Sequence, residues 1–120
     1  MPDAPDPDSV AEPLRALFQA GLSELKLDAT AGRQESLTQL AMLVASWAPR
    51  INLTGHRSLE AIAHRLVLDA VALTAALPEP PTSLVDIGSG AGFPGLPVAI
   101  VHEQCEVVLV EAKERKHHFQ

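Results

Sequence analysis

Four residues at alternate positions, Asp86, Gly88, Gly90 and Gly92, have the types and spacing of a loop that binds a nucleoside cofactor. Glycine has no Cβ, so the backbone can turn sharply there and approach a ligand closely. In such folds an acidic residue about twenty positions further on, at the end of the next strand, accepts hydrogen bonds from ribose hydroxyls. Glu111 follows Gly92 by 19 residues and satisfies that spacing. An ionised carboxylate only accepts, so this one side chain can receive both hydroxyl protons.

The register of the loop separates two kinds of cofactor. Gly90-x-Gly92-x-x-Gly95 matches the dinucleotide pattern G-x-G-x-x-G, which is weak evidence by itself. The first glycine of that pattern directly follows its strand, whereas residues 86–89 intervene here. Asp86 would repel a pyrophosphate but attract the ammonium and sulfonium groups of S-adenosylmethionine (SAM). The pattern D-x-G-x-G-x-G is the one that SAM-dependent methyltransferases use. We therefore predict SAM, with a dinucleotide or a purely structural glycine turn as the alternatives.

The elements around the loop predict an α/β fold. Residues 84–87 and 106–111 have the composition of short apolar strands, and helices are expected from Phe93 or Pro94 onward and over residues 113–120. Strand, glycine loop, helix and strand is the order of a Rossmann-like fold with a parallel sheet. Residues 83–120 supply only the first part of such a domain. We therefore expect a chain truncated after the second strand.

The residues before this unit predict a helical segment over 9–78, preceded by a disordered acidic, proline-rich tail over 1–8. Ser9-x-x-Glu12 has the pattern of a capping box that opens the first helix. The second helix is expected over 34–48, ended by Pro49, and the third from a Ser58 cap to about residue 77. The apolar residues at helical spacing, expected to face a core, are Val10, Leu14, Leu17, Phe18 and Leu22, then Leu37, Leu40, Val44 and Trp47, then Leu59, Ile62, Leu66, Ala70, Leu73 and Leu77.

Composition excludes several classes of protein. The net charge of −6 argues against a free-standing basic nucleic-acid module, although local basic clusters can still contact RNA. The single Cys105 forbids an internal disulfide and fits a reducing compartment, where we expect it to be buried. His117 and His118 lack spaced partners, so no metal site is expected. With neither a signal peptide nor a membrane span in the sequence, we expect a cytoplasmic protein.

The segment VDIGSGAGFPGLP over residues 85–97 resembles the first motif of one bacterial family, the small-subunit ribosomal RNA guanine-N7 methyltransferases, long called glucose-inhibited division protein B. The Phe-Pro-Gly tail after the glycines makes this resemblance specific. The similarity extends over roughly residues 35–120. Its other matching residues are Trp47 with Asn52, Leu53 and Thr54, then Arg65 with Asp69, and then Glu111 with Lys113, Arg115, Lys116 and Phe119. The chain departs from the family pattern at Leu66, where His is usual, and at Ala70, where Ser is usual.

The resemblance implies transfer of a methyl group from SAM to N7 of a guanine in 16S ribosomal RNA. It implies that Gly88 and Phe93 contact SAM, while Gly90, Gly92 and Glu111 complete the loop and ribose sites. A neutral guanine already offers a lone pair at N7, so no general base is required and no catalytic residue is assigned.

On the substrate side, the basic residues of the last segment, Lys113, Arg115 and Lys116, are either an ordinary exposed helix start or contacts to ribosomal RNA phosphates. The alternatives to a methyltransferase fragment are an inactive truncated product, a non-enzymatic binding protein and, more remotely, an NAD-type dinucleotide-binding protein. Free RNA and the assembled ribosomal particle both remain possible substrates.

Overall fold

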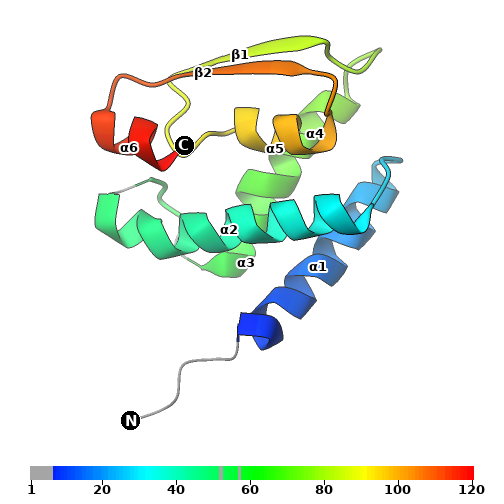
Figure 1. The fold of residues 1–120 in the computed structure, drawn as a ribbon. Helices are drawn as coiled ribbons and strands as arrows, with labels where there is room; N and C mark the ends of the chain where they lie inside the picture. The colour runs from blue at the N-terminus through cyan, green and yellow to red at the C-terminus, as the bar shows by residue number, and fades with distance from the viewer. Residues whose placement is uncertain (1–6, 52, 57) are drawn as a thin grey trace.

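The computed structural model describes residues 7–51, 53–56 and 58–120, and it places a layer of helices beneath a two-stranded sheet (Figure 1). Residues 1–6 of the predicted disordered tail over 1–8 lie outside the described residues, and residues 7 and 8 are helical, which contradicts the prediction there. The helical part contains α1 (Pro7–Glu24), α2 (Ala31–Ile51), α3 (Leu59–Ala61), the π-helix η1 (Ile62–Leu68) and α4 (Asp69–Ala75). The second part contains β1 (Ser83–Ile87), α5 (Gly95–Val101), β2 (Glu106–Val110) and α6 (Glu114–Phe119). The prediction of a helical segment followed by an α/β unit is therefore confirmed.

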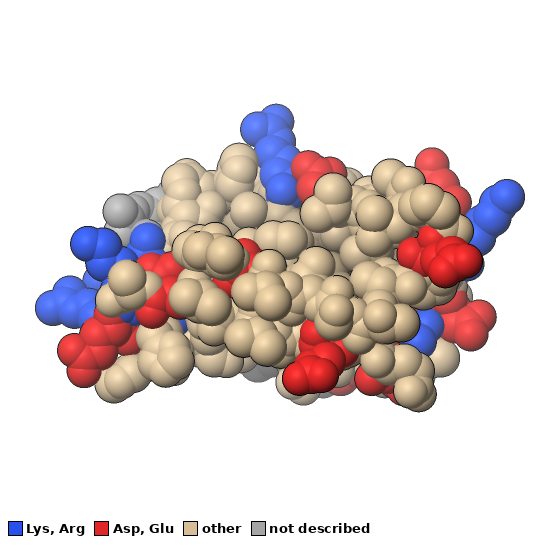
Figure 2. All heavy atoms as spheres, turned by 90° about the horizontal axis from the view of Figure 1, so that it is seen from above, with Lys and Arg blue, Asp and Glu red and all other residues tan. Residues whose placement is uncertain are grey.

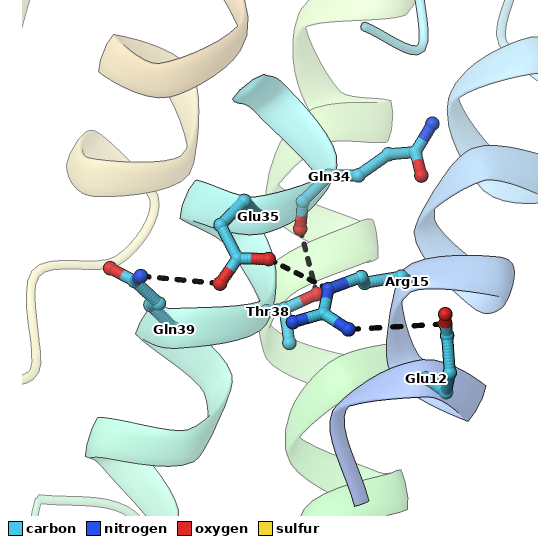
Figure 3. Close-up of polar contacts among 6 residues, drawn as sticks. All are labelled: Glu12, Arg15, Gln34, Glu35, Thr38 and Gln39. Carbon is cyan, nitrogen blue, oxygen red and sulfur yellow. Dashed lines mark hydrogen bonds and ion pairs between the residues drawn. The ribbon is translucent and has the colours of Figure 1, made fainter. Parts of the chain in front are cut away.

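The two long helices pack through their apolar stripes. Phe18 and Leu22 of α1 and Leu37 and Val44 of α2 are fully buried, as their helical spacing predicts. A polar link crosses the same pair of helices at its edge, where the Nε of Arg15 lies 2.7 Å from Oε2 of Glu35 (Figure 3). The Arg15 bond, together with a second one from Gln39, lowers the pKa of the Glu35 carboxyl. Because the pair is on the surface, it orients the helices more than it stabilises them.

Three predicted helix boundaries are wrong. α1 begins at Pro7, so Ser9 lies inside its first turn and does not open the helix with Glu12. A proline suits the first position, because its ring fixes φ near the helical value and its missing N–H would be unpaired there. α2 begins at Ala31, after Thr30, and continues through Pro49 to Ile51. Only two helical residues follow Pro49, so its missing donor affects only the last turn.

The third helical segment begins as predicted but turns differently. Ser58 caps it, since the Ser58 hydroxyl accepts a bond of 3.1 Å from the N–H of Ala61. η1 then winds more widely than an α-helix, because π-helical bonds join residues five apart. The buried face consequently widens to include residues one position further along the chain. The predicted core residues Ile62 and Ala70 are buried, and so are Ala63, Val67, Val71 and Thr74, whereas the predicted core residues Leu73 and Leu77 are 55% and 45% exposed.

The two strands are parallel and neighbours, with Ser83 opposite Glu106 and Ile87 opposite Val110. The inner face of the sheet packs on α5, where Gly95 approaches Leu109 (Figure 1). The outer face is exposed and largely free of charged side chains (Figure 2). Its residues are Val85, Ile87, Val108 and Val110, which are between 45% and 80% exposed. Parallel sheets normally have both faces covered, whereas this face is left exposed by the part of the chain that the structure describes.

His102, at the end of α5, joins the two parts of the chain. Thr74 of α4 donates its hydroxyl proton to the carbonyl oxygen of Val71, at 2.8 Å. The Nε2 of His102, 2.8 Å from the same hydroxyl oxygen, must therefore be the donor in their contact. Burial, and secondly the charge of Arg33, lowers the pKa of His102 below its ordinary value of 6.5.

We expect the burial of His102 to make stability dependent on pH. A depressed pKa means that the unfolded chain binds the proton more readily, so the free energy of unfolding should fall as pH drops below 6.5. Arg33→Gln should raise the pKa of His102, whereas Arg65→Gln should not, because Arg65 does not act on this ring. An NMR titration of the ring protons, assigned with His102→Asn, measures both effects. A pKa at or above 6.5 in the folded chain would contradict the prediction.

Candidate functional site

The glycine loop joins the carboxyl end of β1 to α5 and is tied to the end of β2. The backbone N–H groups of Gly88 and Ser89 both donate to the carbonyl oxygen of Val110, at 2.7 and 3.1 Å. Gly88, Gly90 and Gly92 have positive φ angles of 71°, 59° and 95°. Other residues adopt that conformation at a cost, so the alternating glycines are required by the backbone itself.

The glycines divide into two pairs by what lies beside them. A Cβ at Gly88 or Gly90 would meet no heavy atom within 4 Å. A Cβ at Gly92 would collide with the side chain of Leu96, and one at Gly95 with that of Leu109. Gly92 and Gly95 are therefore needed for packing of the loop and α5. Gly88 and Gly90 border open space, where a ligand has room to approach the backbone.

Asp86 occupies the buried face of β1 and caps α5. Its Oδ2 accepts a bond of 3.0 Å from the N–H of Gly95, the first residue of that helix, and only 8% of the residue is exposed. A carboxylate at a helix N-terminus is favoured by the helix dipole. The structure thus gives Asp86 a clear architectural role, and its charge lies at the base of the loop.

Glu111 directly follows β2 and lies against the loop. Its Oε2 accepts a bond of 2.8 Å from the N–H of Gly90, and its Oε1 accepts one of 3.2 Å from the N–H of Lys113. The Gly90 bond, then the Lys113 bond, and then the charges of Lys116 and Lys113 lower the pKa of the carboxyl. Glu111 is consequently ionised at neutral pH. Two oxygens have about four acceptor positions, so two protein bonds leave capacity for hydroxyl donors.

Gln120 also belongs to this site, and sequence reasoning missed it. Its amide Nε2 lies 2.5 Å from Oγ of Ser89 and 2.8 Å from the carbonyl oxygen of Gly90. Gln120 and Gly90 are thirty residues apart in the sequence. A single glutamine after a short helix belongs to no sequence pattern from which this contact could be predicted. Gln120 attaches the end of α6 to the glycine loop.

The remaining predicted residues lie around this centre. Phe93 is half-buried and packs against both apolar clusters, including the smaller one around Ala48, Leu53 and Ala91. The basic residues lie at the start of α6, where Lys113 and Arg115 are exposed and Lys116 is half-buried. Basic side chains gather at that end of the molecule, interspersed with acidic ones (Figure 2).

Further observations bear on the other predicted features. Cys105 is buried immediately before β2, as expected. Trp47 is 40% exposed, so the expectation that it faces the core is wrong. It lies near the end of α2, beyond the main cluster, and lines a groove against α6. Within residues 7–51, 53–56 and 58–120, no three His, Cys, Asp or Glu side chains come together as metal ligands would. Across that same part of the chain, no helix has the length and apolar character of a membrane span.

Comparison with known proteins places the chain in a family. Residues 33–120 match the family described as rRNA small subunit methyltransferase G, also called GidB. The chain belongs to this family. The matched region includes the glycine loop, Glu111 and all of α6, and it agrees with the resemblance in the sequence over residues 35–120.

Curated members of the GidB family are similar over most of the chain. The ribosomal RNA small subunit methyltransferase G of Chromohalobacter salexigens is 37% identical over 105 residues, which are 88% of this chain and 50% of that protein. Its namesake from Geobacter sp. (strain M21) is 39% identical over 88% of this chain and 48% of its own length. That of Rhodospirillum rubrum is 46% identical over 71% and 42%. The chain thus spans about half the length of the curated relatives it matches.

Proposed function

We propose that this chain carries the SAM-binding part of a Rossmann-like methyltransferase that acts on N7 of a guanine in 16S ribosomal RNA. The observation that carries the proposal is the geometry of Glu111 and the glycine loop. An ionised carboxylate at the end of β2 lies beside two glycines that border open space. Family membership and the names of the relatives support the ribosomal RNA substrate.

The residues present fit SAM better than a dinucleotide. In dinucleotide-binding folds the pyrophosphate takes the N–H groups at the start of the helix after the loop. In this chain the first N–H of α5, that of Gly95, is already bound by the buried carboxylate of Asp86. A second anion would meet both an occupied donor and a like charge. The cationic groups of SAM would instead be attracted to this end of the loop.

Each residue then has a defined part in binding. Glu111 would accept the ribose hydroxyls, Gly88 and Gly90 would let the backbone approach the cofactor, and Phe93 would contact it. When bound, SAM supplies a methyl carbon made electrophilic by its sulfonium sulfur. Because N7 of a neutral guanine has a free lone pair, no side chain has to remove a proton. The contribution of the protein is then to hold the reacting atoms at close distance and in line.

A calorimetric titration of the chain with SAM tests the proposal. We expect binding, and we expect Glu111→Ala to weaken it roughly tenfold or more, because the hydroxyls lose a charged acceptor. Glu111→Gln should lie between the two, since it keeps one carbonyl acceptor. The matched control Glu114→Ala, an exposed carboxylate of α6, should bind as the unchanged chain does. Binding of NADH as tight as that of SAM would refute the assignment.

A further inference from the structure

A groove of about 470 Å³ lies between the end of α2 and α6. Most of its lining is apolar, and two of the apolar residues in it are strongly exposed, Leu43 at 51% and Trp47 at 40%. The residues that line it are Leu43, Trp47, Ile51, Arg115, His118 and Phe119. An exposed indole in the wall of a groove is a flat surface on which another ring can stack.

Basic side chains border this groove. The guanidinium carbon of Arg50 lies 5.4 Å from the centroid of the Trp47 ring, within cation–π distance. Arg115 forms part of the wall and is shared with a neighbouring groove, which Lys113 and Lys116 also line together with Ile51 and Glu114. Among the described residues, those that line the two grooves, together with Arg50, therefore carry four positive charges and one negative charge. An aromatic platform with a cationic border is the arrangement that binds single-stranded nucleic acid.

We propose that this groove receives an unpaired base of the ribosomal RNA, stacked on Trp47, while Arg50 and Arg115 meet the adjoining phosphates. The inference rests on the proposed function, because it takes RNA as the substrate. The basic side chains around the groove favour RNA over a protein helix as its ligand. An apolar helix would fill the groove without using the four cations, whereas each nucleotide brings both a ring and a negative charge.

The position of the groove connects it with the cofactor loop. Phe119 lines the groove, and the next residue, Gln120, donates to the loop at Gly90. An RNA strand stacked on Trp47 of α2 would thus lie beside α6, the helix whose end contacts the cofactor loop. Trp47 would act here as a positioning residue, because it holds the strand and does not touch the reacting atoms.

Trp47 is the only tryptophan of a chain that has no tyrosine, so its fluorescence reports on this groove alone. The experiment titrates the 120-residue chain with a single-stranded RNA hexamer and with an abasic ribose-phosphate hexamer of equal charge. We expect the RNA to quench Trp47 and the abasic strand to bind without quenching. Anisotropy of labelled RNA should then show that Trp47→Ala weakens RNA binding about tenfold, within the range for base–aromatic stacking.

Controls separate this inference from the proposed function. Trp47→Phe should keep most of the affinity, and Leu73→Ala, the truncation of an exposed apolar residue on α4, should keep all of it. Circular dichroism confirms that each variant is folded. RNA binding with unchanged Trp47 emission, or equal quenching by the abasic strand, overturns the inference and leaves the RNA substrate standing. If neither strand binds, the inference fails, while the calorimetric titration with SAM still tests the proposed function separately.

Discussion

Replacing Lys113, Arg115 and Lys116 together by glutamine is expected to weaken RNA binding by one to two orders of magnitude at low salt, a rough figure for three phosphate contacts. Each contact to a single strand contributes about 0.7 to the slope of log affinity against log salt, so that slope should fall by about 2. Glutamine keeps the backbone N–H of residue 113 that binds Glu111, so SAM affinity should change little. Anisotropy titrations at several salt concentrations measure both quantities.

The control for the triple substitution removes positive charges that lie outside α6. Lys26 and Arg65 are exposed on other segments, and their replacement by glutamine should leave the salt slope unaltered. Survival of both affinity and slope in the triple variant would mean that the cluster at α6 is only a solvated helix start. The design also distinguishes charge from stacking, because Trp47→Ala should lower the affinity without changing the slope.

Gly95→Val is expected to lower the free energy of unfolding by about 3 kcal/mol, the upper part of the range for an overpacked core. A Cβ at this position would collide with the side chain of Leu109 and would lie 3.2 Å from Oδ2 of Asp86. The helix and the sheet would have to separate, and the Asp86 cap on α5 would be strained. Chemical denaturation followed by circular dichroism gives the stability, and SAM binding should be lost with it.

Gly32→Ala is the comparison for this change. Gly32 lies in α2, a Cβ there would meet nothing within 4 Å, and its φ is not in the left-handed region. Alanine at such a site should stabilise the chain by about 0.4–1 kcal/mol, since it restricts the unfolded state. If the Gly95→Val chain had the same free energy of unfolding as the Gly32→Ala chain, the conclusion that α5 packs closely on β2 at Gly95 would be wrong.

The sequence was most informative where spacing is tied to backbone conformation. The alternating glycines had to produce the positive φ angles of the loop, and the acidic residue after the second strand had to lie beside it, because parallel strands end at the same edge. Ser58 was identifiable for the same reason, since a cap hydroxyl acts on a donor three residues away. These features are local or follow from one parallel pairing.

The features that escaped prediction depend on packing between distant segments. Nothing in residues 62–68 signals the π-helix, beyond which Thr74 is buried and Leu73 is exposed. Trp47 matched the apolar stripe of α2, yet the helix extends past the cluster that buries the rest of the stripe. Gln120 reaches the loop only because α6 folds back toward it. For Trp47, periodicity gave the face of the helix but not what that face meets.

The two hydrogen bonds of Gln120 join the end of α6 to the glycine loop, so a displacement of one is expected to displace the other. If SAM binds at the loop and RNA at α6, a ligand at either place alters the contact on which the other depends. Such coupling is reciprocal: the factor by which one ligand changes the affinity of the other is the same in both directions. Conversion of the cofactor to its demethylated form would then be communicated to the RNA groove. Release of the demethylated cofactor and release of the methylated RNA would then depend on each other through the hydrogen bonds of the Gln120 amide.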